Sequence, residues 1–335
     1  MKKVAVVILN WNGKNFLEKF LPSVTKYSND YTDIIVADNA STDDSIDFLK
    51  NNYPDVKLII NDKNYGFAQG YNEALKKVEA EYVVLLNSDV EVTKNWIEPI
   101  VELMDADKSI AACQPKLKDY NNKSFFEYAG AAGGFIDYLG YPLCRGRIFN
   151  HLEEDKGQYD DVTEIFWATG ACMFVRMKYF NQVGGLDNHY FAHMEEIDLC
   201  WRFKNLGYKI MFMPNSTVYH VGGGTLNKIK PQKTYLNFRN NLFLLHKNLP
   251  KEKRNWIIFQ RLILDGCAGI KLLFEGKPKH TWAIIKAHFH FYNNIKQNKS
   301  KRQTVYKPNN VGIINKSILV KSFIEKKHTY NELIH

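Results

Sequence analysis

The chain has 335 residues, of which 45% are hydrophobic and 24% charged, so it can bury a large core, and its length predicts about two domains. Its five cysteines are odd in number and scattered, which argues against a disulfide framework and favours a reducing compartment. The formal net charge is +9, but residues 228–335 carry 22 Lys and Arg against 5 Asp and Glu, whereas residues 1–227 carry 23 against 31. An acidic body with a basic tail predicts docking on an anionic surface, either nucleic acid or the cytoplasmic leaflet of a membrane.

The first hundred residues alternate short apolar runs with amphipathic segments. The run at 4–9 is too short for a signal peptide and meets Asn10 without a small-residue cleavage site, so we expect a first strand there. Helical spacing follows it, as at Phe16, Phe20 and Val24. The predicted buried strands lie at 4–9, 34–38, 56–60 and 82–86. This alternation predicts an α/β fold with a mainly parallel, right-handed βαβ sheet and helices on both faces.

The middle of the chain is less regular. Residues 108–161 are irregular and rich in aromatic residues, and regular apolar runs return at 171–175, 210–213 and 218–220. Three glycines at 222–224 precede the change to a basic and aromatic composition. We therefore expect one body up to about residue 227 and a separate tail.

The tail contains two apolar segments with basic neighbours. Residues 256–274 suggest a transmembrane helix, but Arg261, Asp265 and Lys271 interrupt them, and a crossing helix needs about 20 apolar residues. A second stripe has the composition of a helix that lies in the membrane interface. Its members are Trp282, Ile285, Phe289 and Tyr292. A helix that docks this stripe on the body is the alternative, and both interpretations remain open.

Two groups of carboxylates stand beside apolar runs. The run at 82–86 ends at Asn87, Ser88 and Asp89, which places one carboxylate at the C-terminal end of a strand, where ligands bind in open α/β sheets. Three more carboxylates stand together at 195–198. A lone hard carboxylate can share Mg²⁺ or Mn²⁺ with phosphate oxygens, while a separate carboxylate stays free as a base. The pattern predicts metal-assisted chemistry on a phosphorylated substrate.

Five motifs occur in order over about residues 1–225. They are VILNWNG at 7–13, VADNASTD at 36–43, NYGFAQGYN at 64–72, LLNSD at 85–89 and EEIDLCWR at 195–202. In order and spacing they resemble the motifs of family 2 glycosyltransferases, and among these the bacterial rhamnosyltransferase-like members. The resemblance implies a GT-A fold, which is a Rossmann-like, mainly parallel sheet flanked by helices. It also implies inverting transfer of a sugar from a nucleoside-diphosphate sugar.

The resemblance assigns a set of residues to the nucleotide. This set is Leu9, Asn10, Asp38, Gly66 and Asn72. Asp38 would hydrogen-bond the nucleobase, and the backbone around Leu9 and Asn10 would line the same slot. Initiation of a helix is the structural alternative for Asp38, because Ser41 and Asp43 follow it. A turn and a helix start likewise explain Gly66.

The metal site is implied by the family's Asp-x-Asp motif. Asn87, Ser88 and Asp89 stand at that motif with an amide in place of the first acid, which leaves Asp89 as the one charged ligand for Mg²⁺ or Mn²⁺. The resemblance implies that His220 completes the metal or diphosphate site. A structural role is the alternative for His220, because a lone histidine carries little information.

The catalytic base is implied by the family's Glu-Asp-x-Asp motif. Glu196 stands in place of its Asp and would take the proton of the acceptor hydroxyl. Glu195 and Asp198 remain alternatives for the base, although we prefer to pair Asp198 with Arg202 on one helix face. The resemblance assigns acceptor binding to Trp167, Thr169, Gly170 and Glu195, with the indole stacked on a sugar.

We therefore expect a GT-A catalytic domain over residues 1–227, with a nucleotide-binding half at about 1–107 and an acceptor half at about 108–227, and a basic helical extension over 228–335. The expected partners are a nucleoside-diphosphate sugar, a glycan or polyprenyl-diphosphate-linked acceptor, and the cytoplasmic face of the bacterial inner membrane. The expected process is synthesis of a cell-surface polysaccharide. A dehydrogenase-like protein is an alternative, but no Gly-x-Gly-x-x-Gly follows the first strand. Nucleic-acid binding through the tail is another, but no recognised module occurs there.

Overall fold

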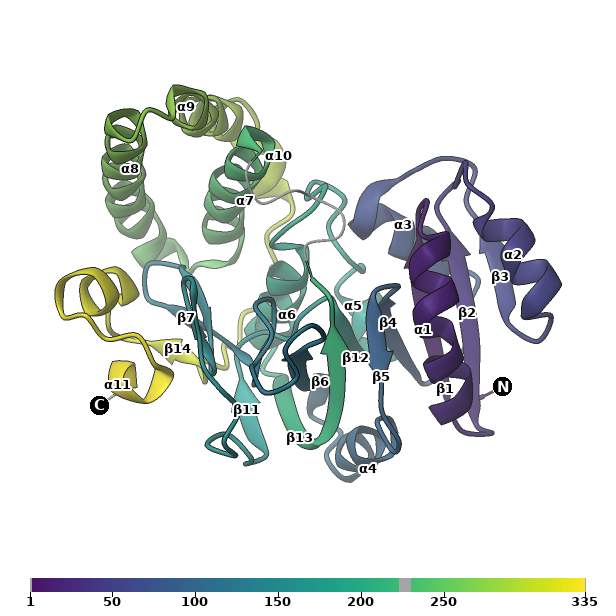
Figure 1. Cartoon of the computed structure of the whole chain (residues 1–335). Helices are drawn as coiled ribbons and strands as arrows, with labels where there is room; N and C mark the ends of the chain where they lie inside the picture. The colour runs from purple at the N-terminus through teal and green to yellow at the C-terminus, as the bar shows by residue number, and fades with distance from the viewer. Residues whose placement is uncertain (1, 223–229, 335) are drawn as a thin grey trace.

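The structure is a computed structural model that describes residues 2–222 and 230–334 (Figure 1). Within these ranges the central sheet has nine strands, and β5 (Val90–Val92) pairs with β13 at one side. The order of the others is β11 (Thr163–Ile165), β13 (Lys209–His220), β6 (Ile110–Asp119), β12 (Cys172–Arg176), β4 (Tyr82–Asn87), β1 (Val4–Asn10), β2 (Thr32–Asp38) and β3 (Lys57–Ile60). Strands β1 to β4 run parallel, and β12 runs antiparallel to β4 and β6.

The four predicted N-terminal strands are confirmed as β1 to β4. The apolar runs at 210–213 and 218–220 belong to one strand, β13, whose pairing with β6 is irregular between Met213 and Thr217. The segment after residue 108 begins with the long strand β6, which the sequence pattern did not reveal. Its alternation is broken by Gln114 and Lys116, and both are buried.

Successive residues of the central strands face two separate hydrophobic layers. Val4 and Val6 of β1 belong to one layer, whereas Ala5 and Val7 belong to the other. The first layer contains α1 (Lys14–Tyr27), α2 (Ser45–Asn52) and α4 (Glu98–Ala106). The second contains α3 (Gly66–Leu75), α5 (Met177–Gln182), α6 (Glu195–Asn205) and α7 (Pro231–Asn248). Because both faces are covered, these strands appear in the sequence as continuous apolar runs.

A second sheet of short strands lies in the irregular part of the chain. Among the described residues its order is β10 (His151–Leu152), β9 (Arg147–Ile148), β8 (Pro142–Cys144), β7 (Gly134–Asp137) and β14 (Ile313–Ile314). Strand β14 comes from the tail and runs parallel to β7. The tail is therefore part of this sheet.

The tail packs on the body as a layer of helices (Figure 1). Its further helices are α8 (Lys251–Phe274), α9 (Pro278–Asn293), α10 (Ile295–Ser300), η1 (Val320–Ile324) and α11 (Tyr330–Ile334). Residues 242–245 of α7, together with Ile318 and Leu333, share one hydrophobic cluster with Ile197 of α6. The hydrophobic core is thus continuous across the change of composition at residue 227. No helix in the described ranges is long and apolar enough to cross a membrane.

Candidate active site

The polar ends of β1 and β2 meet at the carboxyl edge of the sheet. Asn10 and Asp38 are register partners, and both are buried. Nδ2 of Asn10 donates to Oδ2 of Asp38 over 3.0 Å, and the backbone N of Ser41 donates to Oδ1 of Asp38 over 2.8 Å. These bonds stabilise the turn at 38–41, but α2 begins only at Ser45, so Asp38 does not initiate a helix. A contact of Asn10 and Asp38 with a nucleobase stays a prediction.

The loop before α3 closes against the same edge. Nδ2 of Asn39 donates to the carbonyl O of Gly66 over 3.1 Å. Gly66 has a φ of +72°, a left-handed conformation that glycine adopts without a Cβ penalty. Leu9 is half-buried at this edge, one residue before the end of β1. The structure therefore brings four of the five predicted nucleotide residues to one edge of the sheet.

Asn72 is the exception, and the structure gives it a different role. Its Nδ2 donates to the carbonyl O of Leu186 and to Oδ1 of Asn188, both over 2.7 Å, and its Oδ1 accepts from the backbone N of Leu186 over 3.0 Å. Both ends of the amide thus fasten α3 to the loop before α6. The side chain of Asn72 is thus occupied within the protein, and its contact with the nucleotide stays a prediction.

Asp89, His220 and Glu127 form a connected cluster of charged groups. Nε2 of His220 lies 3.1 Å from Oδ1 of Asp89, and Nδ1 lies 3.2 Å from Oε1 of Glu127. Burial opposes a charge on the imidazole, but Glu127 and Asp89 outweigh it and raise the pKa of His220 to about 10. Burial also opposes ionisation of Asp89, but the hydrogen bond from His220 lowers the pKa of this carboxyl. The two predicted metal residues are therefore neighbours.

This cluster fits a divalent cation that a phosphorylated substrate helps to bind. The described residues contain no group of three or more side chains arranged to hold a metal. A cation here would take Asp89 and Nε2 of His220 as ligands and complete its shell with phosphate oxygens and water. Glu127 stands at Nδ1, where an outer carboxylate orients a ligating histidine. Because the ligating imidazole must be neutral, the cation would displace the proton shared by Asp89 and His220.

The carboxylates predicted for the acceptor side lie at the N-terminus of α6. The two residues before them, His193 and Met194, have φ values of 71° and 74°. A left-handed backbone costs of order 1–3 kcal/mol at a residue other than glycine. Asn240 of α7 holds this turn, since its Nδ2 donates to the carbonyl O of Ala192 over 2.9 Å and of His193 over 2.7 Å. The tail thus positions the start of α6.

Glu195 and Glu196 have different environments. Glu195 is 5% exposed, and burial together with the charge of Glu196 raises the pKa of Glu195 well above its ordinary value. Burial raises the pKa of Glu196 to about 7, close to the working pH of a general base. Its Oε2 has no hydrogen-bond partner among the described residues, and Gly170 lies beside its Cβ. Glu196 can therefore accept a proton near neutral pH, whereas burial and the charge of Glu196 disfavour the carboxylate form of Glu195.

Asp198 is fully occupied by structural partners. It is buried and accepts from Nε of Arg202 over 2.8 Å, from Nζ of Lys247 over 2.9 Å and from Nδ2 of Asn248 over 2.9 Å. Burial opposes ionisation, but Lys247 and Arg202 lower the pKa of Asp198. The predicted pairing with Arg202 is confirmed. Asp198 joins α6 to α7, so we do not assign it as the base.

The Lys247→Met variant is expected to lose about 3–5 kcal/mol of unfolding free energy, because a buried charge pair would lose one partner. Nζ of Lys247 contacts Asp198 and also Oδ2 of Asp187 over 2.7 Å. Denaturant unfolding of the full chain measures the loss. Lys277→Met is the matched control, because its pair with Glu275 is exposed and is expected to contribute less than about 1 kcal/mol. Equal stabilities of the two variants would contradict this role of Lys247.

The loop at 166–170 is part of the core, which corrects the prediction for Trp167. The indole is 3% exposed, its Nε1 donates to the carbonyl O of Phe135 over 2.8 Å, and a Cβ added to Gly134 would lie 2.2 Å from it. A ring covered in this way is not open for stacking on a sugar. Thr169 is also buried, and its backbone N donates to Oε1 of Gln114 over 3.0 Å. Both residues shape the wall behind Gly170 and Glu196.

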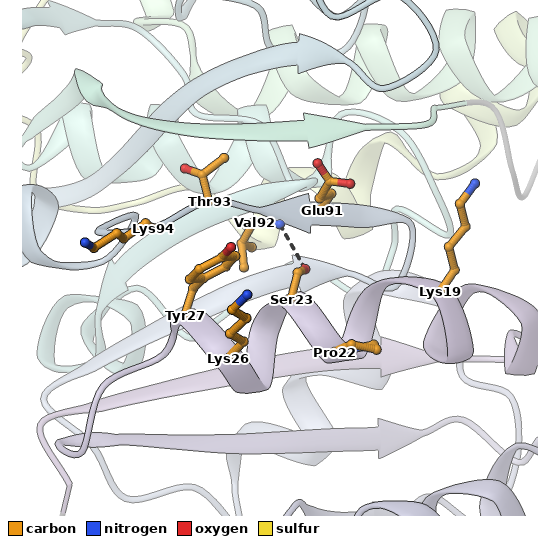
Figure 2. Close-up of a pocket in the computed structure, with 9 residues that line it drawn as sticks. All are labelled: Lys19, Pro22, Ser23, Lys26, Tyr27, Glu91, Val92, Thr93 and Lys94. Atoms are coloured by element: carbon orange, nitrogen blue, oxygen red, sulfur yellow. Dashed lines mark hydrogen bonds between the residues drawn. The ribbon is translucent and has the colours of Figure 1, made fainter.

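A shallow groove of about 460 Å³ lies between α1 and β5 (Figure 2). It is lined by Lys19, Pro22, Ser23, Lys26, Tyr27, Glu91, Val92, Thr93 and Lys94. The backbone N of Val92 donates to Oγ of Ser23 over 3.3 Å across it. None of the predicted site residues lines this groove, so we place the active site at the carboxylates instead.

Three residues of this site were not found from the sequence. Glu127 lies in the irregular segment, and Asn240 and Lys247 lie in the tail, where basic and polar residues were attributed to surface docking. No motif marks them. Their partners are 47 to 93 residues away in the chain, so only the folded structure brings the groups together.

Comparison with known proteins identifies the class of protein that this fold and site define. Residues 5–184 match the profile of the family described as "Glycosyl transferase family 2", which is more than half of the chain. The chain belongs to glycosyl transferase family 2. This result replaces the dehydrogenase-like alternative.

Particular relatives share modest identity over most of their length. An N-acetylglucosaminyl-diphospho-decaprenol L-rhamnosyltransferase of Mycobacterium tuberculosis is 24% identical over 230 residues, which are 64% of this chain and 75% of that protein. The low-salt glycan biosynthesis hexosyltransferase Agl10 of Haloferax volcanii is 21% identical over 87% of this chain and 91% of that protein. Rhamnosyltransferase WbbL of Escherichia coli is 23% identical over 65% and 83% respectively.

Solved structures share the fold. The mannosyltransferase PcManGT from Pyrobaculum calidifontis, solved with GDP-Man and Mn²⁺, superposes with a TM-score of 0.54 at 13% identity, over 87% of each chain. S. aureus TarS 1–349, solved with UDP-GlcNAc, superposes with a TM-score of 0.54 at 14% identity, over 89% of this chain and 90% of that one. The predicted GT-A fold, with a helical C-terminal region, is confirmed.

Proposed function

We propose that this glycosyltransferase inverts the anomeric centre while it moves a hexose or a rhamnose-like deoxyhexose from a nucleoside-diphosphate sugar to a glycan or lipid-linked acceptor. The process would be synthesis of a bacterial cell-surface polysaccharide. The observation that carries the proposal is the division between two carboxylates. Asp89 is held ionised beside His220, whereas Glu196 keeps an unpaired oxygen and a pKa of about 7. Inverting transfer needs one charged group that helps to bind the diphosphate and one unpaired carboxylate that acts as the general base.

Each residue has a defined part in this reaction. The carboxyl ends of β1 and β2, with Gly66, bind the nucleotide. Asp89 and His220 would hold a divalent cation, which would supply positive charge to the departing diphosphate. Glu196 takes the proton of the acceptor hydroxyl as that oxygen attacks the anomeric carbon, so no covalent intermediate with the protein forms. Names of the relatives support the substrate classes, since they include a rhamnosyltransferase for a diphospho-decaprenol acceptor and a hexosyltransferase.

A screen of nucleotide sugars tests the donor class. We expect one nucleoside-diphosphate hexose or deoxyhexose to raise the melting temperature in the presence of Mn²⁺, because a ligand that binds only the native state stabilises it by about 2.7 kcal/mol at a hundredfold excess over Kd. The same donor should support transfer to a lipid-linked acceptor with inversion of the anomeric configuration. Retention of configuration, or absence of binding by every nucleotide sugar, would contradict the proposal.

The tail offers a surface for the membrane at which such an acceptor resides. Helices α8 and α9 pack together, and Oγ1 of Thr281 donates to the carbonyl O of Gly269 over 2.9 Å at their contact. Trp282 and Phe289 are both 64% exposed, so the apolar stripe of α9 faces solvent and the alternative that it docks on the body is wrong. Exposed apolar side chains on the two helices include Trp256, Phe259, Ile263, Ile270, Leu273, Phe274, Trp282, Ile285, Phe289 and Tyr292.

Lysines stand among these apolar side chains. Lys271, Lys277, Lys279 and Lys286 are exposed on or between α8 and α9. Each lysine near anionic lipid contributes about 1 kcal/mol, and the aromatic rings can enter the headgroup region. We therefore place the enzyme on the cytoplasmic face of the inner membrane, with α8 and α9 against anionic lipid.

The Trp282→Ser, Phe289→Ser double variant is expected to lose most of its cosedimentation with anionic vesicles. The wild-type protein should cosediment with anionic vesicles, bind neutral vesicles weakly, and be released in large part by salt. The Tyr31→Ser, Ile60→Ser double variant is the matched control. It removes two exposed apolar side chains far from α8 and α9 in the sequence, one directly before β2 and one at the end of β3. Point variants are preferable to truncation, since residues of the tail belong to the core. Equal cosedimentation of the two double variants would refute the membrane surface.

A further inference from the structure

Arg147 is a buried arginine that forms no ion pair with a carboxylate of the described residues. It stands at the start of β9 and is 8% exposed. Its Nη2 donates to Sγ of Cys144 over 3.4 Å, and its guanidinium lies 4.7 Å from the ring centre of Tyr128. Nε has no hydrogen-bond partner in the described part of the chain. The segment 223–229 contains no acidic residue, so it holds no carboxylate side chain for Arg147 either.

The neighbouring Arg145 has a carboxylate partner, although its Nη2, like Nε of Arg147, has no hydrogen-bond partner among the described residues. Its Nη1 donates to both carboxylate oxygens of Asp161, over 2.9 and 3.0 Å, and its Nε donates to the carbonyl O of Ala132 over 3.1 Å. Burial of a charge is unfavourable unless the charge is paired and hydrogen-bonded. Burial opposes the charge of Arg147, but Cys144, Tyr128 and Glu127 outweigh it and raise the pKa of the guanidinium. Arg147 therefore stays charged without the bidentate carboxylate pair that Arg145 has.

The thiol of Cys144 does not supply the missing negative charge. Burial is the main cause that raises the pKa of this thiol above its ordinary value, so it is neutral at physiological pH. Two carboxylates, Glu127 of the Asp89–His220 cluster and Glu196 at α6, both contribute to that shift. Cys144 thus lies within electrostatic reach of both groups. The guanidinium of Arg147 lies over the ring of Tyr128, the residue that follows Glu127, so it stands beside the cluster of Glu127 and His220.

We infer that Arg147 binds a phosphate group of a substrate, an inference that rests on the proposed function. A guanidinium presents a planar set of N–H donors that matches two phosphate oxygens, and Nε of Arg147 is unused. Both substrates of the proposed reaction carry phosphate near the reacting atoms, the donor in its diphosphate and a lipid-linked acceptor in its own. Binding of either group would give Arg147 the directly paired anion that no carboxylate of residues 2–222 and 230–334 supplies.

Calorimetric titration of the full chain with two probes tests the inference. UDP and GDP, titrated in the presence of Mn²⁺, represent the donor. Geranyl diphosphate, titrated in the presence of saturating nucleoside diphosphate and Mn²⁺, represents the lipid phosphate. Arg147→Met is expected to weaken one of these interactions by about 10- to 100-fold, the usual effect of losing hydrogen bonds to a charged group. The probe that is affected identifies the source of the phosphate.

Two further variants separate a local contact from a general loss of charge. Arg147→Lys keeps the charge without the planar fork and should bind between wild type and Arg147→Met. Arg145→Met removes a positive charge from the same hairpin and should leave both affinities within about threefold of wild type. The melting temperature of Arg147→Met should equal or exceed that of wild type, because an unpaired buried charge is removed.

The outcomes distinguish a failure of the role of Arg147 from a failure of the proposed function. If the wild-type protein binds a probe and Arg147→Met binds both probes as tightly, Arg147 is not a phosphate ligand. A melting temperature that falls while affinity is unchanged would show a structural cation and would also overturn the inference. If the wild-type protein binds neither probe, the proposed function itself fails, and the role of Arg147 fails with it.

Discussion

The Glu196→Gln variant is expected to bind the donor as wild type does and to lose about 10²–10⁴-fold in turnover, the usual contribution of a positioned general base. Gln keeps the shape of the side chain but cannot accept the proton of the acceptor hydroxyl. Glu196 lies at the start of α6 and forms no hydrogen bond or ion pair with Asp89 or His220 in the described structure, so we expect donor and metal binding to be unaffected. Turnover at saturating substrates, together with calorimetric titration of the donor, measures the two effects separately.

The pH dependence of the wild-type rate should report the same group. Because burial raises the pKa of Glu196 to about 7, the rate should increase through about pH 7 and then level off, and this increase should disappear in Glu196→Gln. Stability should change in the opposite direction. The folded-state pKa lies above the ordinary value of 4.5, so ionisation disfavours the native state, and wild type should lose stability relative to the variant between about pH 4.5 and 7.

Two neighbouring variants test the assignment of the base. Glu195→Gln should change turnover little, because burial and the charge of Glu196 disfavour the carboxylate form of Glu195. Asp198→Asn should lower stability, because the carboxylate of Asp198 forms buried ion pairs with Arg202 and Lys247. If either variant keeps donor binding and full stability but loses turnover by 10²-fold or more, that residue is the base and Glu196 is misassigned.

The Asp89→Asn variant is expected to lose most metal-dependent activity, because the cation would lose its one charged protein ligand. The loss in Mn²⁺ affinity should exceed the roughly 10–100-fold loss caused by removing a residue that only hydrogen-bonds a metal ligand. Glu127→Gln supplies that comparison, since Glu127 contacts His220 and not the proposed cation position. Electron paramagnetic resonance measures free Mn²⁺ directly, so the result does not depend on identification of the sugar.

Asp119→Asn is the matched control for this experiment. Asp119 pairs with His220 in the strand register, but its Oδ1 accepts from the backbone N of Asn121 and Asn122. We expect its Mn²⁺ affinity and activity to equal those of wild type. Equal metal dependence of Asp89→Asn and wild type would exclude Asp89 as a ligand and would leave its pair with His220 as a structural contact.

Much of the nucleotide side could be predicted because it follows from local pattern. Strands covered on both faces appear as uninterrupted apolar runs, so β1 to β4 could be placed, and parallel strands end at one edge. Asn10, Asp38 and Asp89 each stand at such an end, so their convergence followed from topology. The acceptor side was less predictable. The strands around Arg147 are two to four residues long and carry no periodic signal.

The tail shows the limit of composition as a guide to structure. Its excess of Lys and Arg predicted a surface segment, and the exposed lysines of α8 and α9 agree with that expectation. However, Lys247 is buried between Asp187 and Asp198, and Asn240 holds the turn before Glu195. Charge counts do not distinguish these residues from exposed ones, because burial depends on the partner that the fold places opposite.

The sequence by itself determined the positions of the N-terminal strands in the chain, the carboxylate at the end of β4 and the pairing of Asp198 with Arg202. Each of these depends on residues within one element or on the common edge of neighbouring strands. Only the tertiary structure decided that Asn72 and Trp167 are occupied inside the protein and that Glu127 joins His220. It also decided that the apolar stripe of α9, which includes Trp282, faces solvent. These outcomes depend on which distant segment packs against a side chain, and no local pattern contains that information.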